Sequence, residues 1–400
     1  MAIIVQKYGG SSVANPERLG LVADRIVAAR QAGDLPVVVV SAMGKTTDAL
    51  LSLAAEVSPQ MHRREMDMIL TAGERISMAL LAMAVIDRGC EALSLTGSQA
   101  GIITTTDHSQ ARIIEVRPIR VHEAISEGKV VIVGGFSGVS TDKEVTTLGR
   151  GGSDTTAIAL AAALDAASCD IFSDVSGVYT ADPQIVSEAR LIDQMSHGAI
   201  LEMGLRGARV LAPEAIDYAR RHNISLRARS TFSEGRGTLI TSADAPGNGR
   251  AIGVTGDDSV LPCSFSGSQG DLDTLLLALE TQGLSWKDVR IEGTDERRSA
   301  ELTLDTSNNP RAEEVLAEIA AEISPTAELS WRPDNATVSV VGEGLAERRA
   351  CWEIARQTLD SIGVEARSLR GSTWGITAEV PRDSLDSVVR SWHEAFPGLG

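Results

Sequence analysis

Short runs of β-branched residues alternate with stretches of helical periodicity over the first 240 residues. Several runs are hydrophobic along most of their length before a polar or glycine-rich loop follows. They are IIVQKY at 3–8, PVVVVSAMG at 36–44, VVIVGGFSG at 130–138, CDIFSDVSG at 169–177 and ISLRARST at 224–231. Strands of this kind, alternating with helices, are typical of a parallel sheet covered by helices on both faces. We therefore predict a three-layer α/β/α domain with a mainly parallel sheet over residues 1–240.

The pattern changes after residue 240. Residues 241–250 are small, polar and rich in glycine, which is typical of a linker. Two groups of strands and helices follow, and each resembles a β-α-β-β-α-β unit. This order predicts two small α+β modules of the ferredoxin-like type, at 251–333 and 334–400.

Composition narrows the classes of partner. The chain has 54 acidic and 37 basic residues, a net charge of −17, which argues against binding to a nucleic-acid backbone. We expect no membrane partner, since no apolar run approaches the ~20 residues of a membrane span, and the first residues resemble a strand rather than a secretion signal. The four cysteines have no metal-ligand spacing and indicate buried thiols in a reducing cytoplasm.

Glycine-rich loops follow several of the predicted strands. The loops are KYGGSS, SAMGKTTD, GGFSG and LGRGGSDTT. In open α/β sheets, ligands bind beyond the carboxyl ends of the strands, where glycines let backbone N–H groups approach an anion. Neither GxxxxGK[ST] nor GxGxxG after a strand is present, and any one loop could be an ordinary turn. Their joint occurrence predicts a phosphate-binding site.

Charged residues in and near these loops have two interpretations each. Lys7 is either a solvated surface cation or a compact charge that meets a transferring phosphoryl group. Arg150, between glycines, could clamp a carboxylate with two hydrogen bonds. Glu74 could cap a helix or balance an ammonium group, and Asp154 and Asp174 fit ordinary caps and turns equally well. The spacing alone leaves these alternatives open.

Taken together, the segments resemble the amino acid kinase family, and within it the aspartate kinases. The matching segments, in chain order, are KYGGSSVAN, VVVVSAMGKTTD, LTAGERISMALLAMA, LTGSQAGIIT, GGFSGVS, VTTLGRGGSDTTAIALAAAL, DVSGVYTADP, GARVL and RARSTF. The C-terminal modules resemble the tandem ACT domains that carry amino-acid feedback in these enzymes. The resemblance implies that ATP phosphorylates the side-chain carboxylate of L-aspartate, a step that leads to lysine, threonine and methionine. That carboxylate is ionised at neutral pH, so no general base is needed.

The resemblance also implies roles for individual residues. It implies two catalytic residues, Lys7 and Asp154. It implies that the substrate is bound by Ser41, Thr47, Glu74, Arg150, Gly151 and Ser153. It implies that the nucleotide is bound by Lys7, Gly9, Gly10, Ser11, Ser173, Asp174, Tyr179, Asp182 and Arg209. Mg²⁺ would bridge phosphate oxygens with few direct protein ligands. The ACT helices would pack across a subunit boundary in a homo-oligomer.

Several positions depart from the family pattern. SDVSG stands where TDVDG is common, Gln184 replaces an arginine, Arg209 a lysine and Ala212 a histidine. We assign these changes to the nucleotide side and expect weaker or altered use of ATP. The ACT loops GSQGDLD at 267–273 and GEGLAERR at 342–349 lack the usual proline–glycine pair, and Trp374 would crowd a small ligand. This predicts altered or absent inhibition by lysine and threonine.

Two alternatives stay open. The chain could phosphorylate another small amino acid or carboxylate in a specialised pathway, because Glu74, Arg150 and Asp154 do not determine the length of the substrate side chain. It could also be a catalytically weak regulatory subunit, which Gln184 and Ala212 favour slightly.

Overall fold

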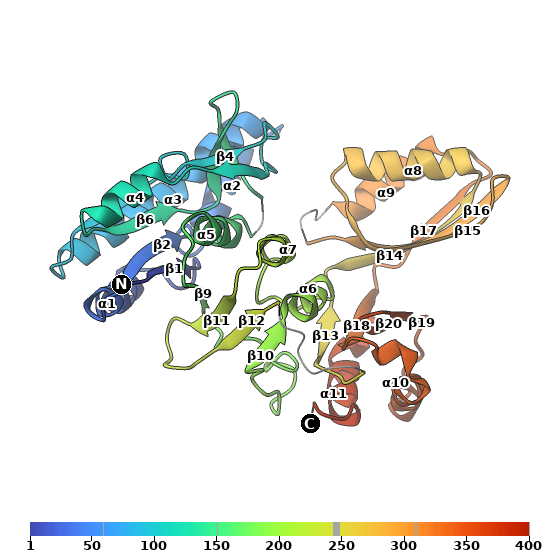
Figure 1. Cartoon of the computed structure of the whole chain (residues 1–400). Coiled ribbons are helices and arrows are strands. Elements are labelled where there is room, and N and C mark those ends of the chain that lie inside the picture. The colour runs from blue at the N-terminus through green and yellow to red at the C-terminus, as the bar shows by residue number, and fades with distance from the viewer. Residues whose placement is uncertain (59, 150, 243–248, 308, 310, 400) are drawn as a thin grey trace. The chain divides into compact units, whose positions relative to one another are not determined.

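The computed structural model describes residues 1–400 except 59, 150, 243–248, 308, 310 and 400. The chain forms two compact units (Figure 1). The first contains 1–178, 191–201 and 209–245, and the second contains 179–190, 202–208 and 246–400. Two short segments from within residues 1–240 therefore group with the C-terminal part of the chain, which the sequence pattern did not indicate.

An eight-stranded sheet forms the centre of the first unit, with the order β10-β12-β11-β9-β1-β2-β6-β3. The strands are β1 (Ile3–Tyr8), β2 (Leu35–Val40), β3 (Ala92–Leu95), β6 (Val130–Gly134), β9 (Ser168–Ser173), β10 (Gln194–Ser196), β11 (Leu226–Ser230) and β12 (Thr238–Thr241). Neighbouring strands are parallel except β11 and β12. The predicted mainly parallel sheet is confirmed.

Helices cover both faces of this sheet. The long helices α1 (Pro16–Gln31) and α3 (Arg63–Ile86) share one buried cluster with Tyr8 and Val40. Successive side chains of a strand point to opposite faces, so Lys7 lies on the other face, where α5 (Gly152–Ala163) packs against β1. Further helices are α2 (Thr46–Val57), α4 (Ile119–Ser126), α6 (His197–Leu205) and α7 (Pro213–Arg221).

Helix α3 is long and apolar enough to cross a membrane by length and composition alone, which corrects the expectation that no run comes near that length. Half of its most apolar window is buried in the first unit, where it packs against α1, β3 and β6. Its buried side includes Asp67, Glu74 and Ser77, whose polar groups bond to neighbouring loops. These contacts are those of a core helix.

A second, smaller sheet lies in the same unit, with the order β5-β4-β7-β8. Its strands are β4 (Ile102–Thr104), β5 (Ile113–Val116), β7 (Ser137–Ser140) and β8 (Val145–Thr147). The predicted glycine loop GGFSG contains the break between β6 and β7, which belong to different sheets. Phe136, in the break, has a φ of 69°, a left-handed conformation that ends a strand.

The second unit contains two four-stranded antiparallel sheets. One has the order β15-β16-β14-β17 and the other has the order β13-β18-β20-β19. The first is built from β14 (Val260–Gly267), α8 (Gln269–Thr281), β15 (Trp286–Thr294), β16 (Arg297–Asp305), α9 (Ala312–Glu322) and β17 (Glu328–Trp331). The other is built from β13 (Gly253–Asp257), β18 (Asn335–Val341), α10 (Arg349–Ser361), β19 (Ser368–Ser372), β20 (Gly375–Pro381) and α11 (Leu385–Ala395). Two α+β modules are present, as predicted.

Strand β13 joins the sheet of the second module, although the whole first module lies between β13 and that sheet in the sequence. Sequence order placed residues 251–259 with the first module, but β13 pairs antiparallel with β18. In the first module the last strand, β17, occupies the equivalent position beside β14. No strand follows α11 in the described chain, so β13 fills this edge and covers apolar residues such as Val338 and Val340.

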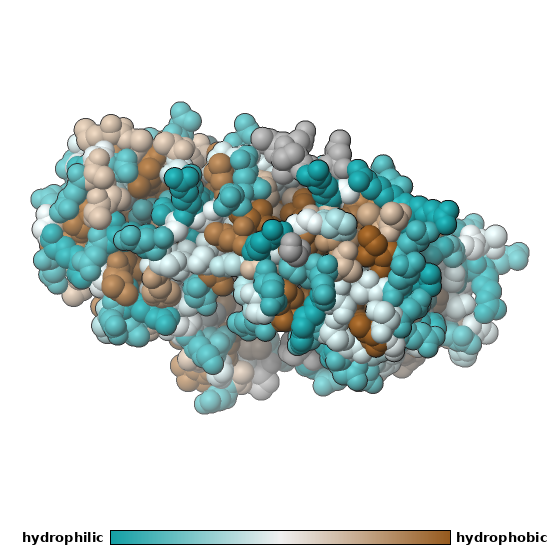
Figure 2. All heavy atoms as spheres, turned by 90° about the horizontal axis from the view of Figure 1, so that it is seen from below, coloured by the Kyte–Doolittle hydropathy of each residue, from teal (hydrophilic) through white to brown (hydrophobic). Residues whose placement is uncertain are grey.

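Hydrophilic side chains predominate on the face of the molecule drawn in Figure 2, and hydrophobic residues lie there in small groups. The share of charged residues in the sequence, 23%, is close to the average of globular proteins.

Candidate active site

An ion pair joins the end of β1 to the first turn of α5. The Nζ atom of Lys7 lies 2.6 Å from Oδ1 of Asp154, and the two side chains are only 12% and 10% exposed. Asp154 is the third residue of α5, where a carboxylate is favoured by the partial positive charge of the helix start. Burial strengthens the pair, so the start of α5 holds the ammonium group of Lys7 in place at the end of β1.

The two glycines after β1 let neighbouring backbone come close. A Cβ atom on Gly9 would lie 3.5 Å from the Nζ atom of Lys7, and a Cβ atom on Gly10 would lie 2.8 Å from the carbonyl oxygen of Ala42. The backbone N–H of Gly44 donates to the carbonyl of Gly10 at 3.0 Å. The loops after β1 and β2 are therefore packed together, and Lys7 lies beside the first of them.

Glu74 reaches this region from α3. Its Oε1 atom accepts a hydrogen bond from the backbone N–H of Ala42 at 3.1 Å, while Oε2 is buried with no hydrogen-bond partner among the described residues. Burial raises the pKa of Glu74 from 4.5 to about 7, against the opposing effect of hydrogen bonds from backbone N–H groups. A buried carboxylate with a free oxygen favours a positively charged partner.

Ser77 is a residue of this region that the sequence motifs did not identify. Its Oγ atom donates to the carbonyl oxygen of Ser41 at 2.8 Å, which ties the loop after β2 to α3. Ser77 stands three residues after Glu74, on the same side of the helix. The buried polar series Asp67, Glu74 and Ser77 at helical spacing was a signal that could have indicated it.

Ser153 and Gly151 are placed by close backbone contacts at the start of α5. A Cβ atom on Gly135, after β6, would lie 2.8 Å from Oγ of Ser153. Gly151 has a φ of 71°, and a Cβ atom there would lie 2.1 Å from the Cβ atom of Ala212. Ala212 therefore lies directly against Gly151. Arg150 lies outside the described residues.

The remaining predicted residues are spread over several loops. Thr47 is in the first turn of α2, and Ser11 lies in the loop after β1, where its carbonyl accepts from Arg18 at 2.6 Å. Ser173 ends β9, the strand beside β1, and Asp174 is exposed in the next position. Arg209 is an exposed residue of the first unit with an interaction partner. Tyr179 and Asp182 belong to the second unit, and their place beside the nucleotide stays a prediction.

The described site thus combines one buried cation, two buried carboxylates and two glycine loops at the exits of adjacent parallel strands. Such a set can hold an anionic group against Lys7 and a cationic group against Glu74 at the same time.

Comparison with known proteins identifies the family. Residues 2–230 match the amino acid kinase family. The chain is 44% identical to the aspartokinase of Mycolicibacterium smegmatis, over 100% of this chain and 97% of that protein. It is 43% identical to the aspartokinase of Corynebacterium glutamicum, over 99% of this chain and 96% of that protein.

The fold is also that of a solved structure. It resembles E. coli aspartokinase III in complex with aspartate and ADP with a TM-score of 0.81, over 98% of this chain and 99% of that chain, at 23% identity. At that identity the likeness supports the fold alone. The family match and the full-length identity to curated relatives decide the assignment: the chain belongs to the amino acid kinase family and, within it, to the aspartokinases.

Proposed function

We propose that this chain is an aspartate kinase, which transfers the γ-phosphoryl group of ATP to the side-chain carboxylate of L-aspartate. The observation that carries the proposal is the buried Lys7–Asp154 pair beside Gly9, with the free carboxylate oxygen of Glu74 near the adjoining loop. The full-length identity to aspartokinases supports the choice of aspartate as acceptor.

Catalysis in this proposal is electrostatic. The acceptor carboxylate is already ionised, so the protein needs no general base and instead holds two anions together. Lys7 neutralises charge on the phosphoryl group as it moves between donor and acceptor. Asp154 keeps the ammonium group of Lys7 in place. Gly9 lies beside that ammonium group, and Gly10 lets the loop after β2 pack closely against the loop after β1.

Glu74 and the start of α5 recognise the amino-acid end of the substrate. The free Oε2 atom of Glu74 accepts from the α-ammonium group, which also stabilises the ionised form of this carboxylate. Ser41, Thr47, Gly151 and Ser153 contribute polar groups around the substrate, and Arg150 binds the α-carboxylate. The solved structure of E. coli aspartokinase III contains aspartate and ADP, which agrees with this pair of reactants.

The nucleotide is bound along the exits of β1 and β9 in this proposal. Ser11, Ser173 and Asp174 contact it from the first unit, with Arg209, Tyr179 and Asp182 as further contacts. Among the residues that the structure describes, no group of three His, Cys, Asp or Glu side chains could hold a metal ion. Mg²⁺, when bound with ATP, would be held mainly by phosphate oxygens and would neutralise their charge.

The two α+β modules are ACT domains in this proposal. We assign residues 1–240 to the kinase domain, 241–250 to a linker, and 251–333 and 334–400 to the ACT domains. Strand β13, within 251–333, is part of the sheet of the second ACT domain. We further propose that the chain acts in the cytoplasm as a homo-oligomer joined through its ACT domains. A sedimentation experiment that finds only a 42.2 kDa species would contradict the oligomer.

Feedback by lysine and threonine is altered or absent in this proposal. The polar groups of the loop before α8 already bond to one another, because Oγ of Ser268 accepts from the N–H of Asp271 at 3.2 Å. These groups would therefore have to exchange partners to bind an amino acid. Asp271 in turn accepts from the N–H of Ser324 at 3.1 Å. An inhibition curve at millimolar lysine plus threonine tests this, and full inhibition would contradict it.

The activity is tested by trapping the product. The purified chain is incubated with ATP, Mg²⁺ and one acid at a time, and hydroxylamine converts any acyl phosphate to a hydroxamate. We expect hydroxamate with aspartate and little with glutamate. Turnover of a different acid would support the kinase of another substrate, and no turnover with any acid would support the regulatory subunit.

A further inference from the structure

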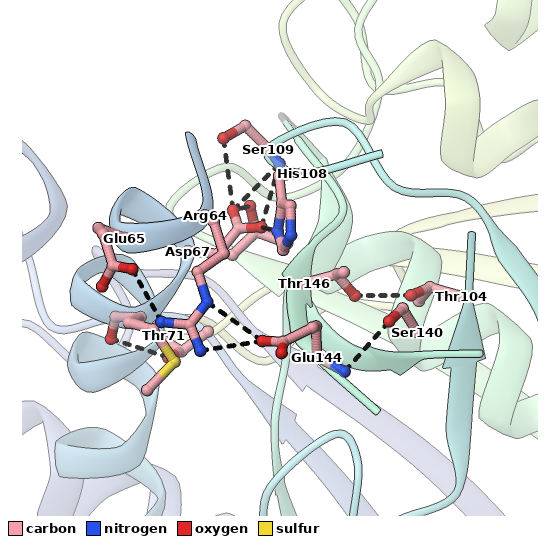
Figure 3. Close-up of polar contacts among 12 residues, drawn as sticks. Arg64, Glu65, Asp67, Thr71, Thr104, His108, Ser109, Ser140, Glu144 and Thr146 are labelled. Carbon is pink, nitrogen blue, oxygen red and sulfur yellow. Dashed lines mark hydrogen bonds and ion pairs between the residues drawn. The ribbon is translucent and has the colours of Figure 1, made fainter. Parts of the chain in front are cut away.

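Asp67, in the second turn of α3, is fully buried and belongs to none of the motifs. Its Oδ2 atom lies 2.7 Å from Nδ1 of His108, and its Oδ1 atom accepts from the backbone N–H of Ser109 at 3.1 Å and from Oγ1 of Thr147 at 2.6 Å. Figure 3 shows His108 and Ser109 grouped around this carboxylate. A buried carboxylate with this many partners is well satisfied, so Asp67 joins three separate segments of the first unit.

Two of those segments meet at the end of β8. Thr147 is the last residue of β8, and its carbonyl oxygen accepts from the N–H of Ala111 at 2.9 Å. The loop that contains His108 and Ser109 is therefore tied to Thr147 twice, once through the backbone and once through Asp67. The end of β8 is held in position against both α3 and this loop.

Ser109 is held in a strained conformation. Its φ of 69° lies in the left-handed region, which costs an L-residue other than glycine about 1–2 kcal/mol. A Cβ atom on Gly149 would lie 3.6 Å from the carbonyl oxygen of Ser109, so the loop touches the turn that follows β8. The hydrogen bond from Ser109 to Asp67 holds this conformation in place.

The turn after β8 leads directly into α5. The N–H of Leu148 donates to the carbonyl of Phe136 at 2.9 Å, and α5 begins at Gly152 with Ser153 and Asp154 in its first turn. We propose that Asp67 is a positioning residue: it fixes the end of β8 as far as Gly149, and through it the groups at the start of α5 that bind the amino-acid substrate. The inference rests on the proposed function for the identity of that substrate.

A second contact joins α3 to the hairpin formed by β7 and β8, and it lies away from the turn into α5. Arg64, one turn before Asp67, donates from its Nη2 atom to Glu144 at 2.9 Å, and both side chains are exposed (Figure 3). Glu144 lies at the opposite end of β8 from the turn into α5. The buried carboxylate differs from this pair because it bonds the residues that adjoin the turn itself.

The kinetic test compares Asp67→Ala with Asp67→Asn in the full chain. Asp67→Ala should raise the KM for aspartate about tenfold or more and leave the KM for ATP within about twofold, because three donors lose their acceptor beside the substrate turn. Asn keeps an oxygen for Ser109 and Thr147, and its NH₂ can donate to neutral His108, so Asp67→Asn should stay within about threefold. Thr147→Val should raise the same KM about threefold or more.

Hydrogen exchange of the unliganded full chain gives a readout that does not depend on turnover. Residues 148–156 should exchange faster in Asp67→Ala and Thr147→Val than in the wild type, and Glu144→Gln should leave both this exchange and the KM unchanged. Absence of aspartate turnover in the wild type, with faster exchange in the variants, would reject the proposed function and support the positioning role. If Asp67→Ala does not fold, Thr147→Val decides. Unchanged exchange with unchanged KM would overturn the inference.

Discussion

The ammonium group of Lys7 and the carboxylate of Asp154 lie 2.6 Å apart and join the central strand β1 to the helix that covers it. The two residues are far apart in the sequence, one near its start and the other in the middle of residues 1–240. Their pairing places a fixed positive charge beside Gly9, where the proposed phosphoryl transfer occurs.

Replacing Lys7 should reduce catalysis far more than binding. Lys7→Ala removes a charge that acts mainly in the transition state, so kcat should fall about 100-fold or more while the KM for aspartate changes only a few-fold. Steady-state ADP release measures both quantities. Lys45→Ala is the matched control, because Lys45 is an exposed lysine in the neighbouring loop. An equal loss in both variants would argue against the role of Lys7.

Glu74 should impose an acidic limb on the pH profile for aspartate. Its pKa is raised to about 7 by burial, and the substrate ammonium group needs the ionised form, so kcat/KM for aspartate should rise as the pH increases through about 7. In Glu74→Gln this limb should disappear and the KM should rise about tenfold or more. Glu56→Gln, at an exposed position of α2, should keep the wild-type profile.

The same group makes a prediction for stability. The carboxyl pKa of Glu74 is higher in the folded chain than its ordinary value of 4.5, so its contribution favours folding below pH 4.5 and is lost as the pH rises through about 7. Glu74→Gln should therefore gain thermal stability relative to the wild type at pH 8 and show little difference at pH 4. If the difference in melting temperature between the variant and the wild type is the same at both pH values, burial does not raise the pKa of Glu74.

The contact between Gly135 and Ser153 predicts the effect of adding one methyl group. In Gly135→Ala the new Cβ atom would lie 2.8 Å from Oγ and 2.9 Å from Cβ of Ser153, so α5 must shift. Overpacking of this kind should cost about 1–3 kcal/mol and raise the KM for aspartate. Gly270→Ala is the control, because its Cβ atom would meet nothing closer than 3.8 Å in helix α8. Thermal unfolding and kinetics of both variants provide the comparison.

The pairing of β13 with β18 predicts which module a change in β13 disturbs. Val254 is fully buried in the cluster that contains Val338 and Trp392, so Val254→Ala should destabilise that module by about 2 kcal/mol. Hydrogen exchange should speed up in β18 and β20 and stay unchanged in β14 and β16. The exposed Val289 offers a control in Val289→Ala. Faster exchange in β14 instead would mean that β13 belongs with the first module.

Local patterns in the sequence were sufficient to predict the class of the fold. The strands predicted from hydrophobic runs are confirmed as β1, β2, β6, β9 and β11. Strand formation can be predicted in this way because it depends largely on the pattern of residues close together in the sequence. The same holds for the two α+β modules after residue 240. The residues proposed for catalysis, such as Lys7 and Asp154, came from matching motifs and not from their contacts.

The tertiary structure alone decided which of these residues meet. Lys7 and Asp154, Glu74 and Ala42, and Ser77 and Ser41 are paired across loops from separate elements, and no local pattern specifies such a contact. Burial of Glu74 raises its pKa, and burial is a property of everything packed around a side chain. The pairing of β13 with β18, across a whole intervening module, depended likewise on which edge was left open. A sequence specifies the elements through near neighbours, whereas long-range packing selects their partners.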